Sequence, residues 1–136
     1  MKKTKGSIRW AKEKKLKFLG IHLIAEFWGG KTIENSKELE KILKLAAKKA
    51  GNTPLEFASH KFNPHGMTGV LLLAESHISF HSWPEHNYIA LDIFTCGPKT
   101  FPERALEALK KELKPKKVII KMIKRGKING KKIPNS

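Results

Sequence analysis

The chain has 136 residues, enough for one domain with a real hydrophobic core, and it lacks an apolar run long enough to cross a membrane. Its single cysteine excludes an internal disulfide and fits a reducing cytoplasm, which is the location that we predict. The net charge of +16 would suit a nucleic-acid partner, but 16 of the 28 Lys and Arg residues lie in residues 1–15 and 114–136. Because the rest of the chain is nearly neutral, we interpret the excess as solvated basic ends. A nucleic-acid-binding module is a distant alternative.

The chain is predicted to have three parts. Residues 1–17 read as a basic N-terminal arm, in which Ile8 and Trp10 could pack. Residues 18–126 carry the periodic apolar pattern of a folded domain, and residues 127–136 read as a basic tail.

Within residues 18–126 the apolar spacing predicts a strand, a helix, four strands, a second helix and a last strand. Asn35 or Ser36 can cap the first helix, and Thr100 can cap the second, which has Pro102 in its first turn. The predicted strands are Phe18–Trp28, Leu55–Phe62, Gly69–Glu75, Ile78–Ser82, Tyr88–Phe94 and Lys116–Ile123, and the helices end near Ala50 and Leu113.

These elements predict an α+β fold. The short connections between consecutive strands favour antiparallel pairing. Each helix has one apolar face to bury, and in the first helix this face consists of Leu39, Ile42, Leu43, Ala46 and Ala50. We therefore expect a two-layer sandwich, a mainly antiparallel sheet with two helices on one face. The other face of the sheet must be solvated or covered by a partner.

Five of the six histidines lie between His60 and His86, so a metal site must be considered. His77 and His81 are four residues apart, a spacing that suits zinc on a helix. Their segment reads as a strand, however, in which four residues span about 13 Å, too far for two ligands of one ion. We therefore predict no metal site and interpret His60, His65 and His86 as exposed or hydrogen-bonded side chains.

An apolar run ends abruptly at Glu75 and Ser76, where an acid and a hydroxyl are followed by two imidazoles in the next five residues. A buried polar group costs about 1–3 kcal/mol unless it finds a partner, so breaks of this kind often mark functional sites. Taken singly, Ser76 is unremarkable, Cys96 reads as a small buried hydrophobe, and Phe62 and Trp83 read as core residues.

Taken together, these residues form a pattern with a known counterpart. The run 74–85, with the segments 62–69 before it and 92–97 after it, resembles the self-processing region of the prokaryotic S-adenosylmethionine decarboxylase proenzyme family. Residues 19–27 look like the first strand of that family. The resemblance covers roughly residues 18–126, with the motifs in the family's order and spacing.

The resemblance implies that the chain cleaves itself between Glu75 and Ser76. The Ser76 hydroxyl would attack the Glu75 carbonyl and convert the amide to an ester. Loss of the Ser76 α-proton would then expel the carboxylate, and hydrolysis would leave a pyruvoyl group at the new N-terminus. In this family the pyruvoyl group forms a Schiff base with the substrate amine and acts as an electron sink for decarboxylation.

The resemblance also implies roles for five further residues. His81 and Thr68 would assist self-cleavage, and Cys96 would donate the proton after loss of carbon dioxide. A thiol with an ordinary pKa near 8.5 is mostly protonated at neutral pH, so it can act as an acid. Phe62 would stack on the adenine of the substrate, and Glu85 would bind the ribose hydroxyls.

The chain departs from the family pattern at three positions. Thr68 stands where the family usually has serine, Ile21 where it usually has arginine, and Ser82 where it usually has threonine. Thr68 keeps the hydroxyl, so we expect self-cleavage, at a reduced rate because the extra methyl group stiffens the side chain.

The resemblance favours a decarboxylase of S-adenosylmethionine that supplies the aminopropyl donor for spermidine biosynthesis. It further implies a homodimer with active sites at the subunit interface. Three alternatives stay open at this point. The same fold and pyruvoyl chemistry could serve arginine or ornithine, because a carboxylate such as Glu85 also suits a guanidinium or ammonium group. An unprocessed regulatory homologue would stay one full-length chain. A nucleic-acid-binding module would keep its function after Ser76→Ala.

Overall fold

The computed structural model describes residues 18–128, which form one sheet and two helices. The predicted arm at 1–17 and residues 129–136 of the predicted tail lie outside the described residues. The elements are β1 (Gly20–Trp28), α2 (Ser36–Lys49), β2 (Pro54–Lys61), β3 (Met67–Leu73), β4 (Ser76–Trp83), the short 3-10 helix η1 (Pro84–His86), β5 (Tyr88–Cys96), α3 (Pro102–Leu113) and β6 (Lys117–Arg125).

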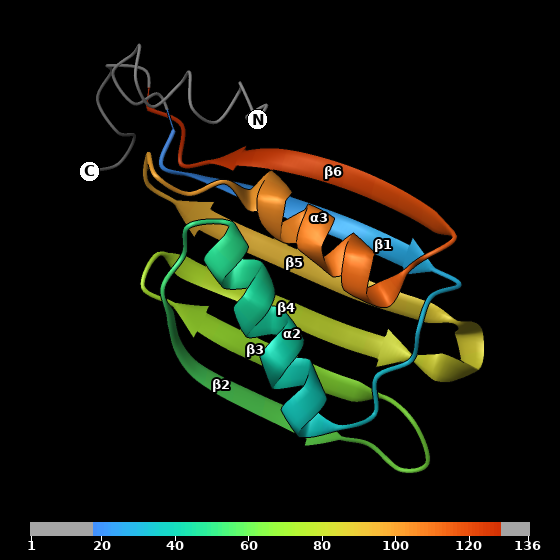
Figure 1. Ribbon diagram of the computed structural model, residues 1–136. Coiled ribbons are helices and arrows are strands. Elements are labelled where there is room, and N and C mark those ends of the chain that lie inside the picture. Colours follow the sequence, from blue (N-terminus) through green and yellow to red (C-terminus); the bar gives the residue numbers. More distant parts are fainter. Residues whose placement is uncertain (1–17, 129–136) are drawn as a thin grey trace, which may run out of the picture.

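The six strands form a single antiparallel sheet in the order β2-β3-β4-β5-β1-β6 (Figure 1). Strands β2 to β5 follow one another as a meander, because their connections are short. The first strand, β1, lies between β5 and β6, so the N-terminal and C-terminal strands are neighbours in the sheet. The predicted antiparallel pairing is confirmed.

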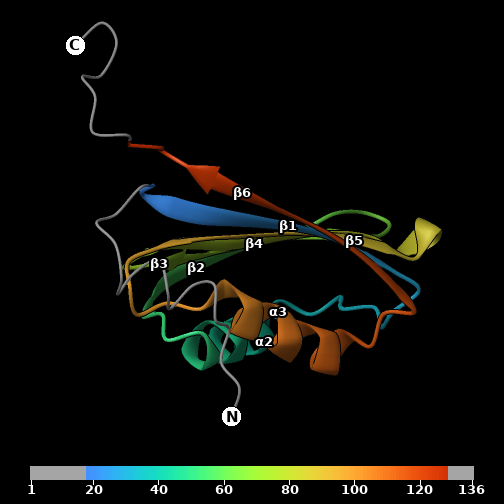
Figure 2. The same ribbon diagram turned by 90° about the horizontal axis from the view of Figure 1, so that it is seen from above.

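Both helices lie against the same face of the sheet, as Figure 2 shows in a view along its edge. The predicted apolar face of α2 is fully used, since Leu39, Ile42, Leu43 and Ala46 are all buried against the sheet. The helix begins where the sequence predicts, because the side chain of Asn35 accepts a hydrogen bond from the backbone N–H of Glu38 at 2.9 Å. The predicted two-layer α+β sandwich is therefore confirmed.

The start of α3 differs from the prediction. Its first cap is Phe101, which makes no capping bond through its side chain, so the expectation that Thr100 caps this helix is wrong. Thr100 is buried, and its hydroxyl points toward the residues that precede it instead of toward the helix. Its hydroxyl lies 3.2 Å from Thr95 Oγ1 and from the Gly97 carbonyl oxygen, and 3.3 Å from the Cys96 carbonyl oxygen. It therefore tightens the corner that follows Cys96.

The face of the sheet opposite the helices, here called the open face, carries a mixture of polar and apolar side chains. Cross-strand partners share a face, so the register sets His22, His77, Ser79, His81 and Asp92 on it. The open face also carries large apolar side chains that are exposed in the single chain: Trp28, Leu72, Trp83, Ile119 and Ile123. Exposed apolar side chains in such number are typical of a surface that a partner covers.

Candidate active site

The Glu75–Ser76 bond lies at the tip of the β3–β4 hairpin. Leu73 pairs with Ser76, so only Ala74 and Glu75 make the turn. A two-residue turn fixes the register of the two strands closely. The β3–β4 hairpin, and with it the peptide bond before Ser76, lies at one end of the sheet (Figure 1).

The thiol of Cys96 contacts this peptide bond. Its Sγ lies 3.1 Å from the carbonyl oxygen of Glu75, and it donates a hydrogen bond to it. Cys96 ends β5, and its side chain is exposed rather than buried, so the sequence-based interpretation as a small buried hydrophobe is wrong. The thiol is thus accessible and directed at the carbonyl that precedes Ser76.

The residues predicted to assist cleavage lie at the other end of the strand pair. Thr68 and His81 face each other across β3 and β4, and Thr68 Oγ1 lies 3.0 Å from His81 Nδ1. His81 is five positions beyond Ser76 along β4, which corresponds to about 17 Å. Within one chain, the structure therefore does not bring this pair to the hairpin.

The two predicted substrate-binding residues lie at the same end of the sheet as Thr68 and His81. Phe62 directly follows β2 and is exposed, with its ring 4.6 Å from that of His60. Glu85 lies in η1, directly after β4, and is also exposed. In Figure 1 the β2–β3 loop and η1 lie at the right-hand end of the sheet, and the β3–β4 hairpin lies at the left-hand end. The predicted site residues therefore form two groups, one at each end.

Between the two ends, the open face holds a polar network to which the sequence pattern assigns no role. Asp92 accepts a hydrogen bond from Ser79 Oγ at 3.0 Å and contacts His22 Nε2 at 3.2 Å. Arg125 Nη1 lies 2.9 Å from His22 Nδ1, which makes Nδ1 an acceptor and leaves the proton on Nε2, toward Asp92. A histidine that interrupts the apolar pattern of β1 is the only signal in the sequence for this network.

His77 lies beside this network, with its ring centroid 6.4 Å from that of His22. Burial lowers the pKa of His77 below its usual range; the carboxylate of Asp92 opposes this shift, and the imidazole of His22 adds to it. His77 is therefore neutral at neutral pH.

At the far end of the open face, Tyr88 packs between two tryptophans. Its ring centroid lies 4.5 Å from that of Trp28 and 5.4 Å from that of Trp83. Its hydroxyl donates a hydrogen bond to the carboxylate of Glu26. Burial, aided by this bond and by the negative charge of Glu26, raises the pKa of Tyr88 to about 12.

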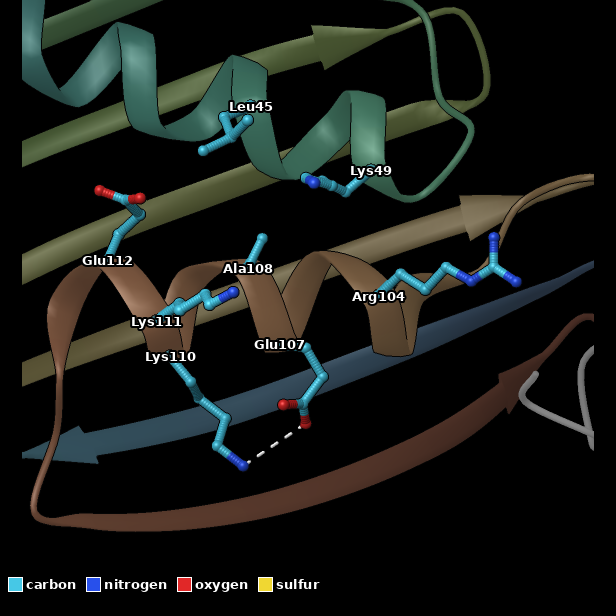
Figure 3. Close-up of a pocket in the computed structure, with 8 residues that line it drawn as sticks. All are labelled: Leu45, Lys49, Arg104, Glu107, Ala108, Lys110, Lys111 and Glu112. Carbon is cyan, nitrogen blue, oxygen red and sulfur yellow. Dashed lines mark hydrogen bonds and ion pairs between the residues drawn. The ribbon is translucent and has the colours of Figure 1, made fainter. Parts of the chain in front are cut away.

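A groove runs between α2 and α3 on the side of the helices away from the sheet (Figure 3). Leu45 and Lys49 line it from α2, and α3 contributes basic and acidic side chains, of which Lys110 and Glu107 form an ion pair at 3.5 Å. None of the predicted site residues lines this groove, so it is separate from the hairpin.

Two further findings concern residues 18–128. No group of three or more His, Cys, Asp or Glu side chains in this part of the chain could hold a metal ion. No helix in the same range is long and apolar enough to cross a membrane. The predicted cytoplasmic location stays a prediction.

Comparisons with known proteins agree with this fold. The model of the S-adenosylmethionine decarboxylase family matches residues 21–126. An S-adenosylmethionine decarboxylase proenzyme from Methanococcus aeolicus is 49% identical over 113 residues, which are 82% of this chain and 97% of the relative. The proenzyme of the same name from Methanococcus maripaludis is 45% identical over 116 residues, covering 84% of this chain and 95% of the relative.

A solved structure gives the same result. The crystal structure of the adenosylmethionine decarboxylase from Aquifex aeolicus matches with a TM-score of 0.78 and 35% sequence identity, and the match covers 86% of this chain and 98% of that one. The shared fold and the sequence matches place the chain in a class of decarboxylases that are made as proenzymes. The chain belongs to the S-adenosylmethionine decarboxylase family, and the resemblance seen in the sequence is confirmed.

Proposed function

We propose that this protein is a decarboxylase of S-adenosylmethionine that makes its own pyruvoyl group by cleavage between Glu75 and Ser76. The observation that carries the proposal is the hydrogen bond of 3.1 Å from the Cys96 thiol to the Glu75 carbonyl oxygen, directly before Ser76. An ordinary hairpin turn gains nothing from an exposed thiol on its carbonyl oxygen, whereas an acyl shift at that carbonyl is aided by a hydrogen-bond donor there.

The first step is an attack of Ser76 Oγ on the carbonyl carbon of Glu75. Negative charge develops on the carbonyl oxygen, and the Cys96 thiol donates to that oxygen, as a hydrogen-bond donor in an oxyanion site does. The amide C–N bond then breaks, the nitrogen takes a proton, and Glu75 is held as an ester on Ser76. Removal of the Ser76 α-proton breaks the ester. The main-chain carboxylate of Glu75 leaves as the new C-terminus of the first chain, and Ser76 becomes a dehydroalanine. Water then releases ammonia and leaves the pyruvoyl group.

The residues at the hairpin fit this group. Ser76 supplies a hydroxyl that is first a nucleophile and then part of a leaving group, and Cys96 lies within reach of the same carbonyl. When present, the pyruvoyl group supplies an electron sink for the carbanion left by loss of carbon dioxide. Cys96 is the proton donor that we propose for that carbanion, since its thiol is exposed at the hairpin.

The active form that we propose is a homodimer with one active site at each end of the interface. His81 lies about 17 Å from Ser76 along β4, too far for proton transfer, and Thr68 of β3 pairs with His81 at the same level. A two-fold axis through the middle of the open face would bring the Thr68–His81 pair of one chain to the hairpin of the other. The exposed Leu72, on the open face between the two groups, supports this face as the interface.

The proposed substrate is S-adenosylmethionine. In the proposed dimer, Phe62 and Glu85 would reach the partner's hairpin together with Thr68 and His81, because all four lie at one end of the sheet. An aromatic face suits both an adenine ring and a sulfonium cation, and a carboxylate suits two vicinal hydroxyls. The relatives from Methanococcus carry the name of this decarboxylase, which supports it over arginine and ornithine and over a nucleic-acid-binding module. The product would supply the aminopropyl donor for spermidine.

The experiment is an intact-mass measurement followed by an activity assay. The purified protein should give two chains, 1–75 and 76–136, whereas the Ser76→Ala variant should stay a single chain of 15.4 kDa. The cleaved protein should release carbon dioxide from S-adenosylmethionine and not from arginine or ornithine, assayed in parallel. A wild-type chain that stays intact would contradict self-cleavage, and turnover of arginine or ornithine alone would contradict the substrate.

A further inference from the structure

The side chain of Glu75 is held by two residues of the loop between α2 and β2. Its Oε1 accepts hydrogen bonds from the backbone N–H of Thr53 at 3.0 Å and from Asn52 Nδ2 at 3.3 Å. Its Oε2 accepts one from the Thr53 hydroxyl at 3.4 Å. Three donors from two consecutive residues thus surround one carboxylate, a charge-assisted arrangement.

Thr53 binds both residues of the hairpin turn through its backbone. Its carbonyl oxygen accepts a hydrogen bond from the backbone N–H of Ala74 at 2.9 Å, while its own N–H donates to Glu75. The two residues of the hairpin turn are therefore both fixed to the same residue outside the hairpin. With the Cys96 thiol on the Glu75 carbonyl, the peptide unit before Ser76 is fixed from two sides.

Asn52 is an unusual residue to find at this place. It is only 5% exposed, and its backbone N–H bonds to the Ala47 carbonyl oxygen at 2.9 Å, so its position at the end of α2 is rigid. Its Oδ1 is buried without a hydrogen-bond partner, the one side-chain atom of this kind in residues 18–128. A buried acceptor without a partner is unfavourable, so a nonpolar residue would serve packing better. The amide contributes one bond, the one to Glu75.

We propose that Asn52 and Thr53 are positioning residues for self-cleavage, which hold the Glu75 carboxylate so that the scissile carbonyl stays directed at the Cys96 thiol. The inference rests on the proposed self-cleavage. An acyl shift requires the Ser76 hydroxyl, the carbonyl carbon and the donor to the carbonyl oxygen to be aligned, and a loose turn would populate that arrangement less often. The two residues touch no reacting atom and act through Glu75.

The test measures the rate of chain splitting after pulsed synthesis in a cell-free extract, on denaturing gels. Asn52→Ala should slow splitting about tenfold, because it removes one bond to a charged group. Glu75→Ala should slow it at least as much, whereas Glu75→Gln should split faster than Glu75→Ala, since its amide oxygen can still accept from Thr53. Asn52→Asp should be the slowest of the set, because it sets two carboxylates against each other.

A double-mutant cycle separates positioning from a general loss of stability. If the amide acts through the carboxylate, the variant Asn52→Ala/Glu75→Ala should split no more slowly than Glu75→Ala alone. Asn35→Ala is the matched control, because it removes a cap of the same helix far from the hairpin and should split at the wild-type rate. Thermal unfolding of each variant identifies any that fails to fold.

The outcomes distinguish the two proposals. A wild-type chain that never splits contradicts the proposed function itself. A wild-type chain that splits, beside an Asn52→Ala variant that splits at the same rate, overturns the positioning role alone. Independent, multiplicative slowing in the double variant, or equal slowing by Asn35→Ala, would also overturn it, since either result indicates a structural effect.

Discussion

The thiol of Cys96 lies 3.1 Å from the carbonyl oxygen of Glu75, although the two residues are 21 positions apart in the sequence. The contact supports the proposal that Cys96 acts in self-cleavage as well as in the later protonation. In the proposed first step the thiol would donate to the oxygen that becomes charged, and in the second it would transfer its proton.

We expect Cys96→Ala to impair the two steps to different degrees. Loss of a proton donor should lower decarboxylation by about 10²-fold or more, measured as carbon dioxide release per cleaved chain. Loss of the hydrogen bond to the carbonyl should slow self-cleavage without abolishing it, since Ser76 remains. The Cys96→Ser variant keeps a donor and should cleave faster than Cys96→Ala. Normal turnover by cleaved Cys96→Ala would remove Cys96 from decarboxylation.

The separation of His81 from Ser76 predicts complementation between chains. His81→Ala and Ser76→Ala should each be uncut when expressed alone. When the two are expressed together, a mixed dimer combines the intact Ser76 of one chain with the intact His81 of the other at one of its two sites. Intact-mass measurement should then find the His81→Ala chain cleaved and the Ser76→Ala chain whole.

A control co-expression tests whether the cleavage depends on His81 of the partner chain. A His81→Ala chain co-expressed with a chain that carries both substitutions should stay uncut, because no intact His81 is present. If the His81→Ala chain is cleaved when expressed alone, His81 has no part in cleavage. If it stays uncut with Ser76→Ala although mixed dimers form, the site is complete within one chain.

A charge on the open face should prevent dimer formation. Leu72 is 46% exposed on this face and pairs with His77 of β4, so Leu72→Lys should give a monomer that is not cut. Leu45→Lys is a matched control, since Leu45 is 38% exposed but lies in the groove between the helices. Analytical ultracentrifugation should find this control dimeric, and its chain should be cleaved. A dimeric, cleaved Leu72→Lys variant would argue against this interface.

The Tyr88–Glu26 bond predicts a loss of stability at alkaline pH. Because the pKa of Tyr88 is raised from 10.0 to about 12, the unfolded chain releases this proton at lower pH than the folded chain. The stability contributed by the protonated Tyr88 hydroxyl, through its burial and its bond to Glu26, is therefore complete below pH 10 and is lost as the pH rises toward 12. The free energy of unfolding of wild type minus that of Tyr88→Phe should fall across this range. A difference that does not vary with pH would contradict the raised pKa of Tyr88.

Much of the fold could be predicted from local patterns. The spacing of apolar residues in α2 and its cap at Asn35 are visible in the sequence because both depend on residues within one or two turns. The hairpin itself is predicted two residues too late: the predicted third strand ends at Glu75, but β3 ends at Leu73 and β4 begins at Ser76, because a change from apolar to polar residues does not show which residues make the turn. Thr100 misled the prediction because a hydroxyl one residue before a helix can bond forward to the helix or backward to the preceding turn, and here it turns back.

The sequence by itself determined the family, because the motifs that contain the hydroxyl, the acid before it and the thiol keep the order and spacing of that family. Tertiary structure alone decided which of these residues meet. It set the Cys96 thiol on the Glu75 carbonyl and brought Asn52 and Thr53 to the Glu75 side chain. It also separated His81 from Ser76 along an extended strand. The physical reason is that strand pairing joins residues distant in the chain, while a strand holds its own residues apart at about 3.3 Å each.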